Sequence, residues 1–368
     1  MKKTVLIAPD SFKGSMSAKE VAKIIAGDVK KYTDFEPVCI PIADGGEGSI
    51  DCLLSAIKGK RCEVDVKSPE WKDTKACYAI CEDGKAIVEF AQSSGITKQD
   101  SFQAAKATSY GFGQVIKAAL DQGARDFILC LGGSATTDGG CGMAAALGVV
   151  FLNEKKESFV PDGGTLSDIC QISFEQMDER IKESTFLVMC DVENTVCGPN
   201  GAAYVYGPQK GAKAEQLPML DSGLHHLAKL LEETLGRDFL AIKGGGAAGG
   251  AGMGCVAFLN AKLQSGIDVI LDLYQVDSLL DNCEMVVTGE GKLDEQSLMG
   301  KVLSGIKRRS GQKPIIAFCG ICELPASKLL QNGIRAVEIG RGIELSEAMK
   351  NGKKYLQEKS NEVWKGIF

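Results

Sequence analysis

Both ends of the chain alternate short apolar runs with helix-like segments, and this alternation limits the possible folds most strongly. At the N-terminus, residues 4–8 (TVLIA) predict a strand. Ser17 and Glu20 then match a capping box, which predicts a helix. Strands that alternate with helices are typical of a mainly parallel sheet covered by helices. The last third of the chain repeats this pattern, with predicted strands at residues 285–288, 314–318 and 334–338.

The middle of the chain has a different pattern. Residues 75–80 and 85–90 flank the sequence EDG, which is typical of a β-hairpin. The simplest interpretation is a discontinuous α/β fold of two domains. We predict a Rossmann/flavodoxin-like parallel-sheet domain built from residues 1–60 and 265–368. Residues 61–264 would form an inserted mixed α/β domain, and the ligand cleft would lie between the two domains.

The stretch from residue 127 to 148 (FILCLGGSATTDGGCGMAAALG) contains the clearest candidate ligand loop. A helix predicted over residues 102–122 precedes it. Its apolar run predicts a buried strand that ends at Gly132 and Gly133, and an Ala-rich helix follows the loop. The backbone N–H groups of such a loop can face an anion, because glycine carries no Cβ and the helix dipole adds positive potential. A tight turn that only packs a helix on the sheet is the alternative.

Polar residues and glycines also follow three other predicted strands. The carboxyl ends of parallel strands meet at one edge of a sheet, where α/β proteins bind their ligands. We therefore expect ligand contacts from these loops. Their residues are Asp10, Ser11 and Lys13 after the first strand, Asp44, Gly45 and Gly46 after the second, and Asp191 and Asn194 after a strand at 185–190.

Residues 243–254 (KGGGAAGGAGMG) form the segment richest in glycine, and a helix is predicted to follow it to about residue 263. Gly244, Gly246 and Gly249 match GxGxxG. The strand–turn–helix context of a dinucleotide site is poor, and no obvious acidic residue ends a following strand. Close approach of a helix, or a hinge, is the alternative interpretation.

Composition excludes several classes of protein. A net charge of −6 and a pI of about 5.3 argue against a nucleic-acid surface. No apolar stretch is long enough to span a bilayer, and we expect a cytoplasmic protein, monomeric or homodimeric, whose fourteen cysteines are mostly buried thiols. With only two histidines, acid–base chemistry must use Asp, Glu or Lys.

Loops of Gly, Ser, Thr, Asp and Lys suit a polyphosphate with a magnesium ion. Backbone N–H groups and lysines would hold phosphate, and carboxylates would hold the metal. The Walker A pattern is absent, because Val302 follows Gly300 and Lys301 and no glycine occupies position 295. A kinase built on this sequence would therefore use another phosphate-binding design.

The chain resembles the bacterial glycerate kinase family of the two-domain, non-Walker type. The resemblance covers nearly the whole length. It implies phosphorylation of D-glycerate with ATP and Mg²⁺, usually to 2-phosphoglycerate, and it agrees with the discontinuous fold. It rests on six ordered motifs, at residues 8–18 (APDSFKGSMSA), 41–49 (PIADGGEGS), 132–143 (GGSATTDGGCGM), 191–212 (DVENTVCGPNGAAYVYGPQKGA), 244–252 (GGGAAGGAG) and 288–301 (TGEGKLDEQSLMGK).

With this resemblance, we assign roles to the candidate residues. Asp191 is predicted to be the base or the acid that orients the hydroxyl, because it ends a strand beside Asn194. A turn is the alternative role for Asp191, and capping of a helix is the alternative for Glu290 and Asp294. The predicted sets are catalytic Asp191, Lys13 and Lys210; ATP-binding Gly132, Gly133, Ser134, Gly246, Gly249 and Lys301; glycerate-binding Asp10, Ser11, Asp44, Gly45, Gly46 and Asn194; and metal-binding Asp294, Glu290 and Asp138.

Three other functions stay open at this point. The enzyme could phosphorylate the 3-hydroxyl or another small hydroxy acid, which a substrate panel would reveal. It could be a dinucleotide oxidoreductase, which NADH binding would test. It could also be a non-catalytic nucleotide sensor, although pure binding would not need the full set of carboxylates.

Overall fold

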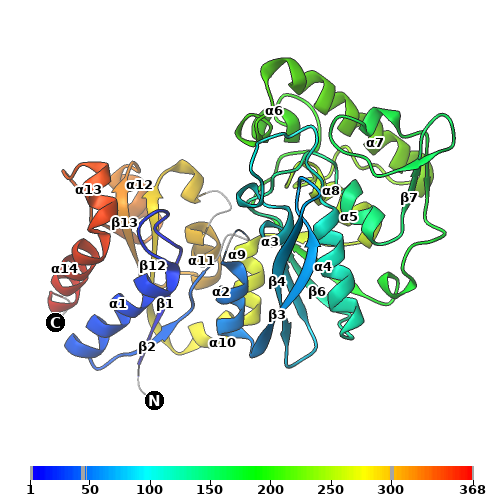
Figure 1. Cartoon of the computed structure of the whole chain (residues 1–368). Coiled ribbons are helices and arrows are strands. Elements are labelled where there is room, and N and C mark those ends of the chain that lie inside the picture. The colour runs from blue at the N-terminus through cyan, green and yellow to red at the C-terminus, as the bar shows by residue number, and fades with distance from the viewer. Residues whose placement is uncertain (1–2, 43–45, 47, 299–301, 367–368) are drawn as a thin grey trace. The chain divides into compact units, whose positions relative to one another are not determined.

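The computed structural model describes residues 3–42, 46, 48–298 and 302–366. The chain divides into two compact units (Figure 1). Unit 1 consists of Met1–Asp44 and Ser265–Phe368, and unit 2 consists of Gly45–Gln264. The predicted fold class is confirmed: both ends of the chain build a parallel-sheet domain, and a mixed α/β domain is inserted between them.

Unit 1 contains a five-stranded sheet in the order β14-β13-β12-β1-β2, and all of its strand pairs are parallel. From β1 the chain moves to β2 on one side, whereas from β12 it moves to β13 and β14 on the other. The direction of winding therefore changes between β1 and β12. In open α/β sheets the carboxyl edge at this position is the usual ligand site. The strands are β1 (Thr4–Pro9), β2 (Glu36–Cys39), β12 (Cys283–Leu293), β13 (Ile315–Cys322) and β14 (Ile334–Glu338).

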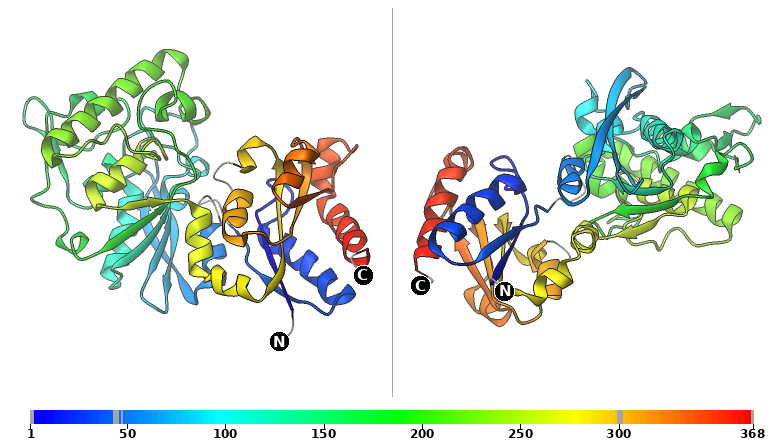
Figure 2. Two further views of the ribbon diagram at one scale, coloured as in Figure 1. Left: turned by 180° about the vertical axis from the view of Figure 1, so that it is seen from behind. Right: turned by 90° about the horizontal axis from the view of Figure 1, so that it is seen from below.

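Helices pack on this sheet through apolar faces. The predicted capping box is present, since Ser17 Oγ accepts from the backbone N–H of Glu20 and the Glu20 carboxylate accepts from that of Ser17. α1 (Ala18–Tyr32) lies beside α14 (Gly352–Lys365) (Figure 2), and the Trp364 side chain is fully buried there. The other helices are α9 (Gly266–Leu273), α10 (Val276–Asp281), α11 (Val302–Ser310), α12 (Ala326–Gln331) and α13 (Leu345–Lys350), with the 3₁₀ helix η6 (Glu295–Leu298).

Unit 2 contains a six-stranded sheet in the order β11-β10-β6-β5-β4-β3. The strands from β11 to β5 are parallel, and β5, β4 and β3 pair in the antiparallel manner predicted for the hairpin. A separate, small antiparallel sheet has the strand order β8-β7-β9. The strands are β3 (Gly59–Lys67), β4 (Asp73–Cys81), β5 (Ala86–Glu89), β6 (Asp126–Cys130), β7 (Val150–Leu152), β8 (Ser158–Phe159), β9 (Gln171–Ser173), β10 (Thr185–Met189) and β11 (Lys262–Gln264).

The core of unit 2 is largely aliphatic, with aromatic pairs at its centre. The rings of Phe127 on β6 and Phe186 on β10 stack with centroids 4.7 Å apart. The helices are α2 (Ser49–Ala56), α3 (Ala91–Ser94), α4 (Tyr110–Asp121), α5 (Cys141–Ala146), α6 (Ala202–Tyr206), α7 (Leu217–Leu235) and α8 (Ala251–Leu259), with 3₁₀ helices η1 (Ile96–Lys98), η2 (Leu166–Asp168), η3 (Glu179–Ile181), η4 (Pro208–Lys210) and η5 (Ala214–Gln216).

Three predicted elements differ from the structure. The helix predicted from residue 102 begins only at Tyr110, after a segment in which Phe102 is 56% exposed and Ser109 is bonded to a distant loop. The helix predicted to reach residue 263 ends at Leu259, and β11 follows it. The strand predicted to end at residue 288 continues to Leu293, because its backbone pairs with β13 along that length.

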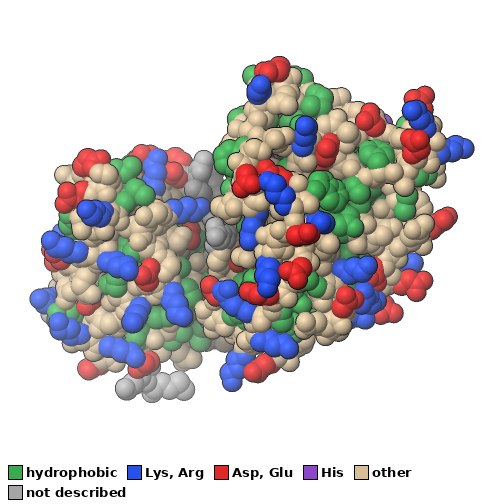
Figure 3. Space-filling view, viewed as in Figure 1, with side chains coloured by type: hydrophobic (Ala, Val, Ile, Leu, Met, Phe, Trp, Pro, Cys, Tyr) green, Lys and Arg blue, Asp and Glu red, His purple; other side chains and the backbone are tan. Residues whose placement is uncertain are grey.

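The exposed surface carries charges of both signs. In the face shown in Figure 3, basic and acidic side chains are interspersed over each unit. All fourteen cysteines are free thiols, including Cys319 and Cys322 on β13. Within the described ranges, no helix has the length and apolar character needed to cross a membrane.

Candidate functional site

In unit 1, the predicted residues meet at the edge where the winding direction changes. The Asp10 backbone N–H donates to the carbonyl of Gly289 at 2.8 Å, which joins the loop after β1 to β12. Pro9 is paired with Gly289, so Asp10, just after the end of β1, and Glu290, on β12, occupy neighbouring positions. Adjacent strands are about 4.8 Å apart. The structure therefore brings Asp10 and Glu290 together, with Ser11 next to Asp10 in the same loop.

Two other predicted residues, Ser11 and Lys13, lie on the loop after β1 that carries Asp10. The Ser11 backbone N–H donates to Asp10 Oδ1 at 2.6 Å, which fixes the start of the loop. Lys13 is exposed, and its backbone passes Gly291 of β12. Because Lys13 combines exposure with this location, it is well placed to meet an anionic ligand of unit 1.

Glu290 and Asp294 are too far apart to be simple partners on one ion. Since β12 stays extended to Leu293, the four residue steps from Glu290 to Asp294 span about 13 Å. Glu290 is buried on the strand, whereas Asp294 Oδ1 accepts from the backbone N–H of Ser297 at 3.3 Å. The described residues contain no group of three or more potential metal ligands. Mg²⁺ needs only one or two carboxylates beside phosphate oxygens, so Glu290 with Asp10 fits a magnesium ion better than Glu290 with Asp294.

The loop that precedes α2 lies only partly within the described residues. Asp44 and Gly45 are outside them, whereas Gly46 is within them. Lys301, directly before α11, is also outside the described residues.

Sequence reasoning missed Glu89, which ends β5 and is 1% exposed. Its carboxylate accepts from the backbone N–H of Ile50 at 2.5 Å and so caps the start of α2, although burial raises its pKa. The acidic residue at the end of a predicted strand was the signal that could have found it.

In unit 2, the turn after β6 presents a row of backbone donors. Gly133 adopts a φ of +72°, and its carbonyl accepts from the N–H of Ile96 at 2.9 Å. Among the described residues, the backbone N–H groups of Gly132, Gly133 and Ser134 have no acceptor. Gly133 is exposed and Gly132 partly so. Consecutive unpaired N–H groups in such a turn form a concavity suited to an anion.

Lys210 lies directly behind this turn. It ends the short helix η4 after β10, and its side chain is 2% exposed. Lys210 Nζ donates to Ser134 Oγ at 2.8 Å and to the carbonyl of Thr136 at 2.7 Å. Burial lowers the pKa of Lys210 to about 7, and the field of Asp138 opposes that shift only in part. Lys210 therefore supports the turn from the protein interior, and its ammonium group does not extend into solvent.

Asp138 is enclosed by donors of its own unit. It is fully buried, and its Oδ2 accepts from the backbone N–H and the Oγ–H of Ser109, both at 2.7 Å. The N–H groups of Gly140 and Gly142 each donate to the carboxylate at 3.2 Å. Burial raises its pKa, against these hydrogen bonds. This arrangement favours a role in fixing the loop over the metal-binding role that the sequence suggested.

The glycines of the GxGxxG match are used for packing against other loops. A Cβ on Gly249 would lie 1.9 Å from the carbonyl oxygen of Thr136, and one on Gly246 would lie 2.4 Å from that of Thr195. The space left by the absent side chains is filled by protein backbone. Gly246 and Gly249 therefore hold the loops after β6 and β10 together, which favours the close-approach interpretation over a dinucleotide site.

Asp191 and Asn194 follow β10 at the same edge of the sheet. Asp191 is exposed. The Asn194 side chain is engaged within its own loop, because its Nδ2–H donates to the carbonyl of Asn200 and its Oδ1 accepts from the hydroxyl of Tyr206, both at 2.7 Å. Asn194 thus shapes the loop, while Asp191 is the more exposed residue of the pair.

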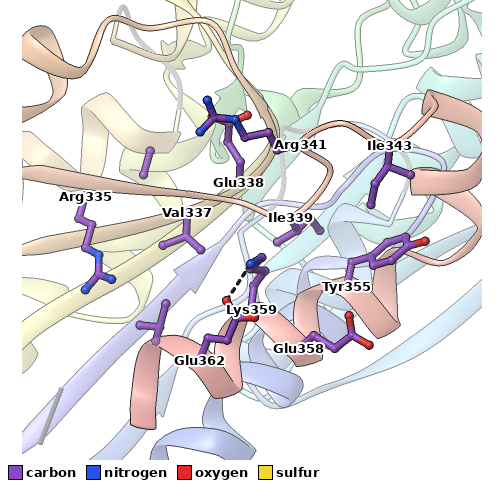
Figure 4. A pocket seen from close by; sticks show the side chains of 12 residues that line it. Arg335, Val337, Glu338, Ile339, Arg341, Ile343, Tyr355, Glu358, Lys359 and Glu362 are labelled. Atoms are coloured by element: carbon purple, nitrogen blue, oxygen red, sulfur yellow. Dashed lines mark hydrogen bonds and ion pairs between the residues drawn. The ribbon is translucent and has the colours of Figure 1, made fainter. Parts of the chain in front are cut away.

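A separate cavity of about 650 Å³ lies in unit 1 between β14 and α14 (Figure 4). Its wall includes Ile339, Tyr355 and a set of charged side chains, and Lys359 pairs with Glu362 at 2.7 Å. The cavity wall carries as many cationic as anionic side chains, so it has no net positive charge that would attract a polyphosphate. None of the predicted site residues contributes to it. The charged residues are Arg335, Arg341 and Lys359 with Glu338, Glu358 and Glu362.

Replacing Gly249 by Ala should destabilise the protein by more than about 3 kcal/mol, because the new Cβ collides with the Thr136 carbonyl. Gly236→Ala is a matched control: its φ of +68° is nearly the +69° of Gly249, but no atom lies within 4 Å of the new Cβ. It should cost about 1 kcal/mol, the usual cost of a left-handed Ala. Urea unfolding of both variants measures the difference, and equal losses would contradict the packing role.

Asp138→Ala should cost at least about 3 kcal/mol in free energy of unfolding, because it leaves three buried N–H groups and the Ser109 hydroxyl without their acceptor. The exposed Asp168 serves as the control, and Asp168→Ala should change stability by less than about 0.5 kcal/mol. Denaturant melts report both values. A loss near that of the control would show that the carboxylate does not hold the loop.

The low pKa of Lys210 predicts a pH dependence of stability. Unfolding returns its pKa from about 7 to 10.5, so between these values the unfolded chain binds more protons. The free energy of unfolding contributed by this group therefore rises with pH across that window. Lys210→Met should flatten the rise. Lys229→Met, at an exposed lysine paired with Glu232, should leave it unchanged. Urea titrations at several pH values test this, and parallel slopes in all three proteins would refute it.

Known proteins similar to this chain include glycerate kinases. A family model described as "Glycerate kinase family" matches residues 5–367. A glycerate kinase from Halalkalibacterium halodurans is 38% identical over 98% of this chain and 97% of the relative. A glycerate 2-kinase from Escherichia coli is 37% identical over 90% of this chain and 89% of the relative.

A solved structure agrees over the whole fold. The crystal structure of a candidate glycerate kinase 2 from Salmonella typhimurium LT2 superposes with a TM-score of 0.86, at 34% identity, over 100% of this chain and 98% of the other. The match of a family model to nearly the entire chain, together with these relatives, shows that the chain belongs to the glycerate kinase family and is a kinase.

Proposed function

We propose that the protein transfers the γ-phosphoryl group of ATP to the 2-hydroxyl of D-glycerate in the presence of Mg²⁺. The observation that best supports the phosphate-binding part is the turn at Gly132, Gly133 and Ser134, whose backbone N–H groups are unpaired among the described residues, with Lys210 behind them. Family membership and the glycerate 2-kinase relative support the acceptor and its 2-hydroxyl.

Each unit has proposed ligand contacts in the loops at the carboxyl ends of its strands. In unit 2, the turn after β6 would hold phosphate, and Gly246 and Gly249 would keep that turn beside the loop of Asp191. In unit 1, Lys13 would pair with phosphate or with the glycerate carboxylate. We retain Asp10, Ser11, Asp44, Gly45 and Gly46 as proposed contacts of glycerate, with Asn194 shaping the loop of Asp191.

Asp191 is proposed to accept the proton of the glycerate hydroxyl. As the hydroxyl oxygen forms its bond to the γ-phosphorus, the bond between that phosphorus and the β-bridging oxygen breaks, and ADP leaves. Exposure of Asp191 at the end of β10 supports this role, since a base must reach the substrate within hydrogen-bond distance.

We propose that Glu290 and Asp10 hold the magnesium ion, whereas Asp294 lies too far along the chain to share that ion. Bound Mg²⁺ would neutralise charge on the transferring phosphate. Fourteen free thiols fit a reducing compartment, which supports a cytoplasmic location.

Product analysis by ³¹P NMR tests the proposed reaction. The protein would be incubated with ATP, Mg²⁺ and D-glycerate. A 2-phosphoglycerate resonance is the expected result, and omission of Mg²⁺ should abolish it. A 3-phosphoglycerate resonance would keep the kinase but refute the 2-hydroxyl as acceptor, while ATP binding without any phosphorylated product would refute D-glycerate as the substrate.

Asp191→Asn should lower kcat by several orders of magnitude, because the amide cannot accept the proton. Glu193→Gln is the matched control: Glu193 is an exposed acid two residues further along the same loop, paired with Lys243 at 3.3 Å. Steady-state kinetics with D-glycerate compare the two variants. An Asp191→Asn enzyme within tenfold of the parent would remove Asp191 from the chemistry.

A further inference from the structure

A buried lysine, Lys210, lies directly behind the Gly132–Ser134 turn that we propose to bind phosphate. Lys210 reaches across from the loop after β10, and both of its described hydrogen-bond partners, Ser134 and Thr136, belong to the loop after β6. Its Nζ is therefore one hydrogen bond away from Ser134, whose own N–H belongs to the turn. No solvent layer separates this cation from the turn, since both Lys210 and Ser134 are buried.

The charge around Lys210 is sparse. Asp138 is the charged group whose field acts on it, and the Asp138 carboxylate is already saturated by donors from Ser109, Gly140 and Gly142. Within its own segment, the next cation is the exposed Lys213, three residues further along. No described carboxylate forms an ion pair with Lys210. In the free protein, Lys210 therefore has no ion-pair partner among the described residues, and the buried Asp138 is the negative charge that acts on it.

We infer that binding of a phosphate oxyanion at the Gly132–Ser134 turn is coupled to the uptake of one proton from solvent by Lys210. The anion would add a second negative charge on the outer side of the turn, and only the buried Ser134 would separate it from Lys210, so little solvent would screen the two charges. Lys210 acts through Ser134 and Thr136, so it is a positioning residue. The identity of the ligand, ATP, rests on the proposed function.

The direction of the coupling follows from burial. Desolvation holds the pKa of free Lys210 near 7, and a bound anion raises it again. Well below pH 7 the lysine is already charged, so binding takes up no proton there. Above pH 7, binding must protonate it, and affinity should fall as pH rises.

Calorimetry can count the protons directly. ATP would be titrated into the protein with EDTA and without glycerate, so that no turnover occurs, in buffers that differ in ionisation enthalpy. At about pH 8 the wild type should take up most of one proton per ATP bound, and at about pH 6 much less. Equal proton counts at the two pH values, or a count of zero at pH 8, would overturn the inference without any variant.

Variants of Lys210 test whether this residue takes up the proton. Lys210→Arg keeps the charge at every pH and should bind ATP at pH 8 without proton uptake. Lys210→Met should bind about tenfold more weakly and also take up no proton. Lys229→Met, on an exposed helix face, should behave as the wild type. Uptake that persists in the Arg and Met variants would assign the proton to another group and refute the role of Lys210.

The ³¹P product assay separates this inference from the proposed function. Product formation by a wild type that binds ATP without proton uptake would refute the coupling and leave the kinase reaction intact. Proton-coupled binding of ATP without any product from glycerate would refute the reaction and leave the coupling intact. A wild type that does not bind ATP would overturn both.

Discussion

Backbone packed directly on backbone fixes the candidate site of unit 2. Gly249 contacts the carbonyl of Thr136 and Gly246 contacts that of Thr195, at separations where no Cβ fits. These contacts hold the loop after β6 beside the loop after β10, although the two strands end 59 residues apart in sequence. Lys210, from the loop after β10, reaches Ser134 and Thr136 across this short spacing.

Buried polar groups then give the turn a single conformation. Asp138 collects four donors from the loop and from Ser109, and Lys210 bonds Ser134 and Thr136 from the opposite loop. Burying these charges is unfavourable, as the shifted pKa values of both groups indicate. Such costs are common where a protein must hold ligand-binding groups in place before the ligand arrives.

Unit 1 builds its candidate site by topology. The winding direction changes between β1 and β12, so Asp10 and Glu290 occupy neighbouring positions at the carboxyl edge of the sheet. Sequence reasoning found both acids because each follows the apolar core of a strand. It placed Glu290 with Asp294 in one loop, whereas β12 remains extended to Leu293. Pairing with β13 overrode the loop-forming tendency of the two glycines in that segment.

The sequence by itself determined the fold class and the family, because strand periodicity, the Ser17 capping box and six motifs are local features. It also marked Gly132, Ser134, Asp138 and Lys210. Only the tertiary structure decided what those residues do. Lys210 and Ser134 are 76 residues apart, and burial, which sets the Lys210 pKa, arises from packing among segments that no local pattern relates. The same applies to Gly246 and Gly249, since a motif match gives the absence of a side chain but not what fills the space.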